Sequence, residues 1–247
     1  MRKGARIVRQ GQRRVLRIDD TFASTYEPGR VTTGSVWDAI ACGVLALPSK
    51  RRRRVLLLGL GGGSTARIVR ALAPEAVIVG VELCADVVRL AQKHLDLDAL
   101  GLEVRIGDAR EVVRGERARY DAILEDVFVG SGRNAYKPEG LPHPLLEEAK
   151  ALLRPGGVIV SNALDEASAV RKAMTDLFSN VVEVGLVEFD NRIYVGSDVR
   201  LSARDLRRAV AEDALLGETL SQFRFRSRQA ARVSRPRVLR GNEAPCD

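Results

Sequence analysis

The sequence predicts an α/β protein in which helices cover both faces of a parallel sheet and a small N-terminal β-hairpin precedes that sheet. The main observation is that short, uninterrupted apolar strands alternate with helical segments from residue 55 onwards, as is typical of parallel sheets buried on both faces. The chain also has 247 residues, of which 45% are apolar and 29% charged. That is enough to bury one large core.

The N-terminal region is predicted to contain the hairpin and then a helix. Residues 5–10 and 13–18 are β-like, and Gly11-Gln12 between them suits a tight turn. Residues 33–47 place apolar side chains at helical spacing and end before Pro48, which cannot continue a helix. We assign residues 1–30 to a hairpin extension.

The main domain is predicted to span residues 31–216, with a flexible, Arg-rich tail at 217–247. Its strands are expected at 55–58, 77–81, 103–106, 122–124, 158–161, 181–187 and 192–196, the last two as an antiparallel pair. Its helices are expected at 64–73, 85–95, 109–114, 143–153 and 166–178. In such folds ligands bind beyond the carboxyl ends of the strands, so polar residues there are the candidate site.

The composition argues against a membrane protein and against a metal centre. No apolar run approaches the roughly 20 residues of a membrane-spanning helix, and the N-terminus lacks the apolar stretch of a signal peptide. We therefore expect a cytoplasmic protein. The chain has three cysteines without C-x-x-C spacing and two histidines, so the sequence predicts no metal site.

The charge of the chain is unevenly distributed. Residues 1–20 hold seven Arg or Lys against two Asp, residues 50–54 are all basic, and residues 217–247 hold seven Arg against three acids. The formal net charge is +8, so the body between these flanks carries a balance of −6. Basic flanks can neutralise phosphates, but aromatic residues for base stacking are few. We read the flanks as solvated surface and do not expect nucleic-acid binding.

A glycine-rich loop follows the first strand of the main domain. The segment Gly59-Leu60-Gly61-Gly62-Gly63 lies between a buried strand and a helix, where glycines let a ligand approach the backbone and the helix N-terminus. A structural tight turn explains the same glycines. Glu82 ends the next strand about 20 residues on, where nucleotide-binding folds place the acid that accepts ribose hydroxyls. Together they indicate adenosine binding at Gly59, Gly61, Gly63 and Glu82.

The next two strand ends carry further acidic residues. Gly107-Asp108-Ala109 ends the third strand, and Asp108 either faces an adenine amino group, caps the following helix, or does both. Glu125 and Asp126 end the fourth strand. Two adjacent carboxylates at a cleft are costly to desolvate unless they meet a cation or accept a proton. We expect Asp126 to face the reacting centre and Glu125 to be a second acid; the alternative is an exposed acid pair.

These motifs together resemble the spermidine synthase (polyamine aminopropyltransferase) family, within the class I S-adenosylmethionine-dependent methyltransferase fold. The resemblance covers about residues 5–200 and implies a Rossmann-like, seven-stranded methyltransferase sheet. It also implies that the glycine loop holds the methionine-derived part of the donor, that Glu82 binds the ribose, and that Asp108 and Ala109 meet the adenine. By the same resemblance Asp126 matches the catalytic aspartate of the family, and no metal is required.

The sequence departs from that family at two positions and in one segment. Gly62 stands where the family motif G-G-G-D-G-G has the Asp that grips the donor's amino group. Val129 stands at the second Asp of the family motif D-S-S-D, and the tyrosine-rich amine-binding segment is not recognisable. Decarboxylated S-adenosylmethionine and S-adenosylmethionine differ by one carboxylate, so either remains open as donor.

The leading interpretation is transfer of an aminopropyl group from decarboxylated S-adenosylmethionine to a small-molecule (poly)amine by in-line displacement. One alternative is an S-adenosylmethionine-dependent methyltransferase that uses the same pocket. The other is a non-catalytic nucleotide-binding or nucleic-acid-associated protein. A homodimer is compatible with each of them. The sequence does not identify the acceptor.

Overall fold

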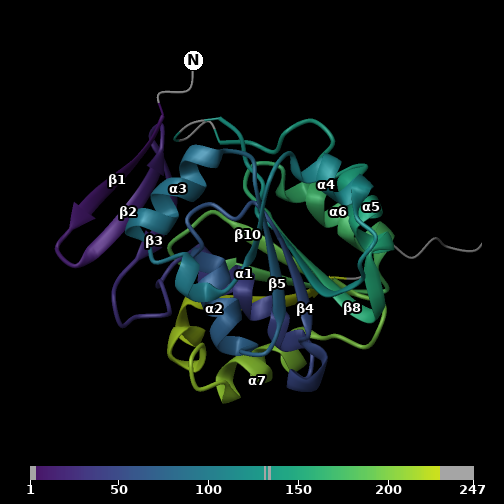
Figure 1. Ribbon diagram of the computed structural model, residues 1–247. Coiled ribbons are helices and arrows are strands. Elements are labelled where there is room, and N and C mark those ends of the chain that lie inside the picture. Colours follow the sequence, from purple (N-terminus) through teal and green to yellow (C-terminus); the bar gives the residue numbers. More distant parts are fainter. Residues whose placement is uncertain (1–3, 131, 133–134, 229–247) are drawn as a thin grey trace, which may run out of the picture.

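The computed structural model describes residues 4–130, 132 and 135–228. A small antiparallel sheet lies beside a large sheet flanked by helices (Figure 1). The small sheet has the order β1-β2-β3, formed by Ala5–Gln10, Arg13–Ile18 and Thr21–Tyr26. The predicted hairpin is therefore confirmed as β1 and β2, and β3 adds a third strand to it.

The large sheet has eight strands in the order β11-β9-β10-β8-β7-β4-β5-β6. Strands β4 to β8 pair in parallel, whereas β10, β9 and β11 pair antiparallel at one side. The bounds are β4 Arg54–Leu58, β5 Val77–Glu82, β6 Glu103–Ile106, β7 Tyr120–Glu125, β8 Leu153–Ala163, β9 Asn180–Leu186, β10 Arg192–Ser197 and β11 Phe223–Arg228. The predicted Rossmann-like methyltransferase sheet is confirmed, with eight strands in place of seven.

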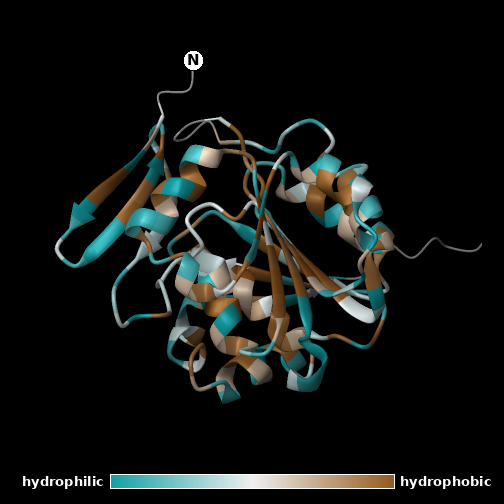
Figure 2. Ribbon diagram, viewed as in Figure 1, coloured by the Kyte–Doolittle hydropathy of each residue, from teal (hydrophilic) through white to brown (hydrophobic). Residues whose placement is uncertain are grey.

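Helices cover both faces of the large sheet, as its apolar strands require. The bounds are α1 Val36–Cys42, α2 Ser64–Leu72, α3 Ala85–His94, α4 Ala109–Gly115, α5 Leu145–Ala151, α6 Ala167–Leu177 and α7 Ala203–Glu212. One core contains apolar side chains of α1, α2, α3 and α7, and the other contains those of α4, α5 and α6. Figure 2 shows the central strands as hydrophobic between these layers.

The start of the predicted tail is part of the sheet. Residues 217–222 form a 3₁₀ helix, η5, and Phe223–Arg228 form β11, which pairs with β9. Phe223 and Phe225 pack on the core, while the alternate arginines face the other way, as side chains alternate along a strand. Residues 217–228 are thus ordered, contrary to the expectation of a flexible tail, and residues 229–247 lie outside the described residues.

Helix α7 was not predicted from the sequence. Only two of its apolar side chains, Leu206 and Val210, are buried, because most of the helix is charged or polar. Its N-terminus does carry a recognisable signal, because the Ser202 hydroxyl accepts the Asp205 N–H at 3.1 Å, as in an N-cap. None of the helices within residues 4–130, 132 and 135–228 has the length and apolar character that crossing a bilayer needs.

Candidate active site

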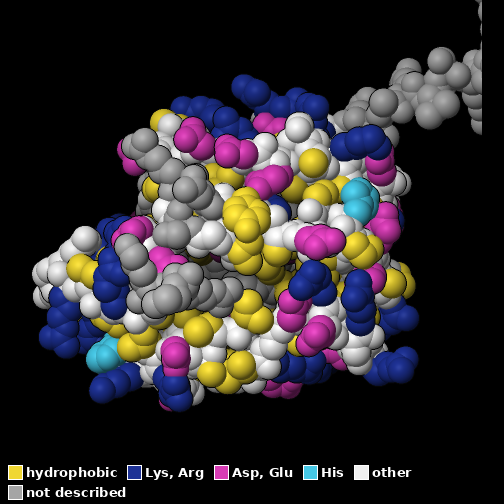
Figure 3. Space-filling model, turned by 90° about the horizontal axis from the view of Figure 1, so that it is seen from above, with side chains coloured by type: hydrophobic (Ala, Val, Ile, Leu, Met, Phe, Trp, Pro, Cys, Tyr) yellow, Lys and Arg dark blue, Asp and Glu magenta, His cyan; other side chains and the backbone are white. Residues whose placement is uncertain are grey.

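A cavity of about 740 Å³ opens at the carboxyl ends of the parallel strands, where the sequence placed the site. Six of the eight predicted site residues line it: Gly59, Gly61, Glu82, Asp108, Ala109 and Asp126. Gly63 and Glu125 do not. Figure 3 looks onto this end of the molecule and shows hydrophobic side chains at the centre, with most charged side chains around them.

The glycine loop connects β4 to α2, and at Gly59 and Gly63 it leaves no room for a side chain. At Gly59, with φ +87°, a Cβ atom would lie 2.4 Å from the carbonyl oxygen of Asp126. At Gly63, with φ +88°, it would lie 2.6 Å from Leu97 Cδ1. Gly63 therefore packs α2 against the rest of the fold, whereas Gly59 keeps the strand ends of β4 and β7 in contact at the cavity.

Gly62, which stands where the spermidine synthase motif has an aspartate, is surrounded by packed side chains. A Cβ at this position would lie 2.7 Å from Ser24 Cβ and 2.5 Å from Leu95 Cδ1. The Ser24 hydroxyl is hydrogen-bonded to that of Ser64 at 2.8 Å, which ties β3 to the start of α2. The space that an aspartate at position 62 would need is thus filled by the N-terminal sheet and α3.

Glu82 ends β5 with its carboxylate fixed at the cavity wall. Its two oxygens accept different backbone N–H groups, Gly61 at 2.9 Å and Cys84 at 3.0 Å. The first of these bonds joins the carboxylate to the glycine loop. A carboxylate oxygen has two lone pairs and can accept more than one hydrogen bond.

Asp108 follows β6 and is the N-cap of α4, which starts at Ala109. Its carboxylate accepts the Arg110 N–H at 2.8 Å and the Arg110 guanidinium at 2.7 Å and 3.0 Å. The hydrogen bonds from the Arg110 side chain, more than any other cause, hold the pKa of Asp108 below its usual range. Asp108 is therefore a helix cap, as one of the two sequence interpretations predicted, and it also lines the cavity.

Asp126 lies at the tip of β7 and is held by an amide relay. Its Oδ1 accepts the side-chain N–H of Asn162 at 2.8 Å, and the side-chain oxygen of Asn162, Oδ1, accepts the side-chain N–H of Asn191 at 2.9 Å. Burial raises the pKa of Asp126 to about 6, against the hydrogen bond from Asn162 and the positive charge of Lys137. A carboxyl that titrates near neutrality can exchange a proton with a substrate at physiological pH.

Glu125 points away from the cavity, so the expected pair of acids at its mouth is wrong. Consecutive residues of a strand face opposite sides, and the tip of β7 directs only Asp126 inward. Glu125 is fully buried, and its Oε1 accepts Lys137 Nζ at 2.6 Å and the Val127 N–H at 2.8 Å. Its Oε2 accepts the Ser161 hydroxyl at 2.6 Å. Glu125 is a structural ion-pair partner and does not contact the presumed reacting centre.

Lys137, Asn162 and Asn191 were not among the site residues predicted from the sequence. Lys137 is buried and contacts the Val127 carbonyl at 3.3 Å, so it holds the loop after β7 against the strand end. Asn162 sits near the carboxyl end of β8, and a polar residue at that position is the same signal that identified the acids at the other strand ends. No local signal marks Asn191, because its contact with Asn162 depends on the pairing of β10 with β8.

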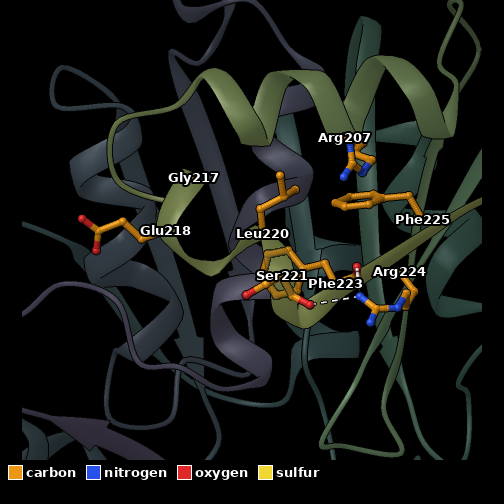
Figure 4. A pocket seen from close by; sticks show the side chains of 8 residues that line it. All are labelled: Arg207, Gly217, Glu218, Leu220, Ser221, Phe223, Arg224 and Phe225. Carbon is orange, nitrogen blue, oxygen red and sulfur yellow. Dashed lines mark hydrogen bonds between the residues drawn. The ribbon is translucent and has the colours of Figure 1, made fainter.

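A second hollow of about 600 Å³ lies between α7, η5 and β11 (Figure 4). Arg207, Glu218, Phe225 and Arg224 are among the residues that line it, and Arg224 donates to the Ser221 carbonyl at 3.0 Å. None of the predicted site residues lines this hollow. Within the part of the chain that the structure describes, no group of three or more His, Cys, Asp or Glu is arranged to hold a metal ion.

Comparison with known proteins agrees with this architecture. A protein-family model described as a methyltransferase domain matches residues 49–207, a segment that contains all eight predicted site residues. The chain belongs to the methyltransferase domain family. The matched segment begins before β4 and ends within α7, so the N-terminal sheet and β11 lie outside it.

Relatives of this methyltransferase-domain protein include both kinds of transferase that its sequence suggested. A polyamine aminopropyltransferase from Vibrio vulnificus is 33% identical over 138 residues, which cover 51% of this chain and 45% of that protein. An eEF1A lysine and N-terminal methyltransferase from Danio rerio is 33% identical over 135 residues, which cover 51% of this chain and 20% of that protein. The match thus spans less than half the length of these curated relatives.

The fold itself resembles that of a spermidine synthase along almost its whole length. The crystal structure of a probable spermidine synthase from Corynebacterium glutamicum has a TM-score of 0.73 with this chain, at 20% identity, and covers 99% of this chain and 98% of that one. The N-terminal sheet and β11 are therefore within the shared fold. The resemblance to the spermidine synthase family within the class I methyltransferase fold is confirmed.

Proposed function

We propose that this protein is a transferase that moves an alkyl group from an adenosyl sulfonium donor to an amine nitrogen held beside Asp126. The observation that carries the proposal is the placement of Asp126, with its raised pKa, in the same cavity as Gly61, Glu82 and Asp108. The aminopropyl group of decarboxylated S-adenosylmethionine is the leading candidate, by analogy with the aminopropyltransferase relatives.

The donor fits the half of the cavity formed by β4, β5 and β6. Glu82 offers both carboxylate oxygens to the ribose hydroxyls, and its bond to Gly61 keeps it in place. In this proposal the adenine ring lies against Asp108 and Ala109, which line the cavity at the neighbouring strand end. Gly59 and Gly61 line the cavity, and their lack of a side chain lets the rest of the donor approach the backbone of the loop.

The reaction in this proposal is a single displacement at carbon. The lone pair of a neutral amine attacks the carbon attached to the sulfonium sulfur, and the carbon–sulfur bond breaks with its electrons going to sulfur. A neutral thioether leaves, and the nitrogen becomes positively charged. Asp126 accepts the proton that the amine must lose, and positioning of the two reactants supplies much of the rate, up to about 7–11 kcal/mol in favourable cases.

Methyl transfer from S-adenosylmethionine is the alternative, and one observation favours it. The family aspartate that would bind the donor's amine is replaced by Gly62, and Ser24 and Leu95 occupy the space beside it. Without that acid, the carboxylate of the full donor meets less repulsion. The eEF1A methyltransferase relative is as similar in identity as the aminopropyltransferase.

Identification of the leaving product tests the proposal and separates the two reactions. The protein would be incubated in single-turnover amounts with each donor and a panel of amines, and the products identified by mass spectrometry. We expect 5′-methylthioadenosine, which reports aminopropyl transfer; S-adenosylhomocysteine would instead report methyl transfer. If neither donor is bound or consumed with any amine, the protein is not a transferase of this type.

A further inference from the structure

The two halves of the cavity differ in polarity. The half at β4, β5 and β6 carries the charged side chains of Glu82, Asp108 and Arg110. The half beyond β7, where β8 ends and β10 begins, is lined by large apolar side chains and by the uncharged amides of Asn162 and Asn191. Five of these apolar side chains are Phe22, Trp37, Val127, Leu164 and Phe189.

Asp126 is the carboxylate that lines the cavity next to this apolar half. Among the described residues that line the cavity, the one further acid outside the donor half is Asp20. Its side chain is 64% exposed at the rim and lies 3.5 Å from the Arg6 guanidinium, and Arg17 lines the same rim. Glu125 adds no charge to the cavity, because Lys137 neutralises it within the core.

This distribution of charge restricts the acceptor. A diamine or polyamine carries an ammonium group at each end, so its second ammonium would lie against the apolar wall or beside the basic rim. An ammonium removed from water without a partner is strongly disfavoured. An apolar body in the same place is favoured, by about fourfold in affinity for each buried methylene.

We infer that the acceptor is a primary amine with a single charged head and an apolar body, which Asp126 binds at the head and the wall beyond β7 binds along the body. The inference rests on the proposed function and names the substrate class of the same cavity. It departs from the polyamine acceptors that the sequence resemblance implied.

The test uses the fluorescence of Trp37, which is the one tryptophan of the chain. Trp37 lines the cavity and interacts with Asp126, so an amine bound there changes its emission. The matched probes are pentylamine and 1,4-diaminobutane, which differ in a terminal methyl or ammonium group. Titrations are made with 5′-methylthioadenosine present, so that the donor half is occupied.

We expect pentylamine to bind roughly tenfold or more tightly than 1,4-diaminobutane. We also expect affinity to rise along the series butylamine, hexylamine and octylamine by about fourfold per methylene until the wall is filled. Equal or tighter binding of the diamine overturns the inference. If Asp20→Asn then abolishes that binding, the rim acid is the second anchor.

A variant that adds a carboxylate to the wall tests the same reasoning from the other side. Phe189 lies in the partly exposed loop between β9 and β10, so Phe189→Glu introduces a charge there and Phe189→Gln is its matched control. The Glu variant should bind 1,4-diaminobutane at least as tightly as pentylamine, whereas the Gln variant should still prefer pentylamine. Circular dichroism shows whether each variant is folded, and an unchanged preference in a folded Glu variant contradicts the inference.

The two proposals fail in different ways. If no adenosyl compound stabilises the protein against heat and no donor is consumed, the proposed function fails, while the ranking of amines can still be measured without 5′-methylthioadenosine. If a donor is consumed with 1,4-diaminobutane and not with pentylamine, the proposed function stands and the inference about the acceptor is wrong.

Discussion

Removing the positive charge of Lys137 should destabilise the protein strongly, because it leaves Glu125 buried and charged without its partner. Lys137 Nζ lies 2.6 Å from Glu125 Oε1, and the two side chains are 1% and 0% exposed. Breaking a buried ion pair by removing one partner typically costs about 3–5 kcal/mol. Glu125 keeps its hydrogen bonds from Ser161 and the Val127 N–H, so we expect Lys137→Met to cost about 3 kcal/mol, at the lower end.

The contribution of the stranded charge can be separated from the contribution of lost packing. In the double variant Lys137→Met with Glu125→Gln, the amide is neutral and can still bond to Ser161 and to the Val127 N–H. We expect the double variant to recover about half of the lost stability. Lys172→Met is the control, because Lys172 pairs with Asp176 on the surface and is 77% exposed, so its loss should stay below about 0.5 kcal/mol.

Urea denaturation followed by circular dichroism measures these free energies of unfolding. The reasoning is refuted if Lys137→Met costs less than about 1 kcal/mol, or if Glu125→Gln in the same background brings no recovery. Either result would mean that the Glu125 charge is not held in a water-excluded site. The loop after β7 would then have a different anchor at the wall of the cavity.

Three further predictions concern the cavity itself. Because burial raises the pKa of Asp126 to about 6, the folded state disfavours its charge, and the stability of the protein should fall as pH rises from about 4 through 6. Asp126→Asn should therefore have a higher melting temperature than wild type at pH 8, and the difference should close near pH 4. An equal difference in melting temperature at both pH values contradicts this prediction. Glu82→Gln should weaken the binding of 5′-methylthioadenosine by about 1.5–3 kcal/mol in calorimetry. The control Glu75→Gln, at an exposed position, should leave the binding unchanged. Unchanged affinity in a folded Glu82 variant removes Glu82 from the site. Gly62→Asp should lower the free energy of unfolding by about 1–3 kcal/mol because of the close contacts at that position. Gly115→Asp, which has open space around it, should lower it by less. A Gly62 variant of full stability means that the loop can move aside.

Much of the fold and of the donor half of the site was predictable from local patterns. Apolar runs followed by glycine or an acid mark the ends of β4, β5, β6 and β7, and these patterns placed Glu82, Asp108 and Asp126 on one cavity. The period-two alternation of strands also predicts that Glu125 faces away from Asp126. The expectation of two acids at the mouth did not apply that rule.

Other features depend on contacts that no local pattern encodes. The packing at Gly62 comes from Ser24, which lies in β3 of the N-terminal sheet. The relay to Asp126 requires β10 to pair with β8, which brings Asn191 to Asn162. In β11, the alternation of Phe223 and Phe225 with arginines was a strand signal, but the excess of charge suggested a solvated tail.

The single-turnover transfer rate of Asp126→Asn tests the central claim most directly. The variant would be compared with wild type and with the exposed control Asp176→Asn, using whichever donor and amine give product. The amide keeps the shape of the side chain but cannot accept the amine's proton, so the rate should fall by about 10²–10⁴-fold while donor affinity in calorimetry changes little. Asp176→Asn should retain the wild-type rate. A full transfer rate in a folded Asp126→Asn variant would contradict the account.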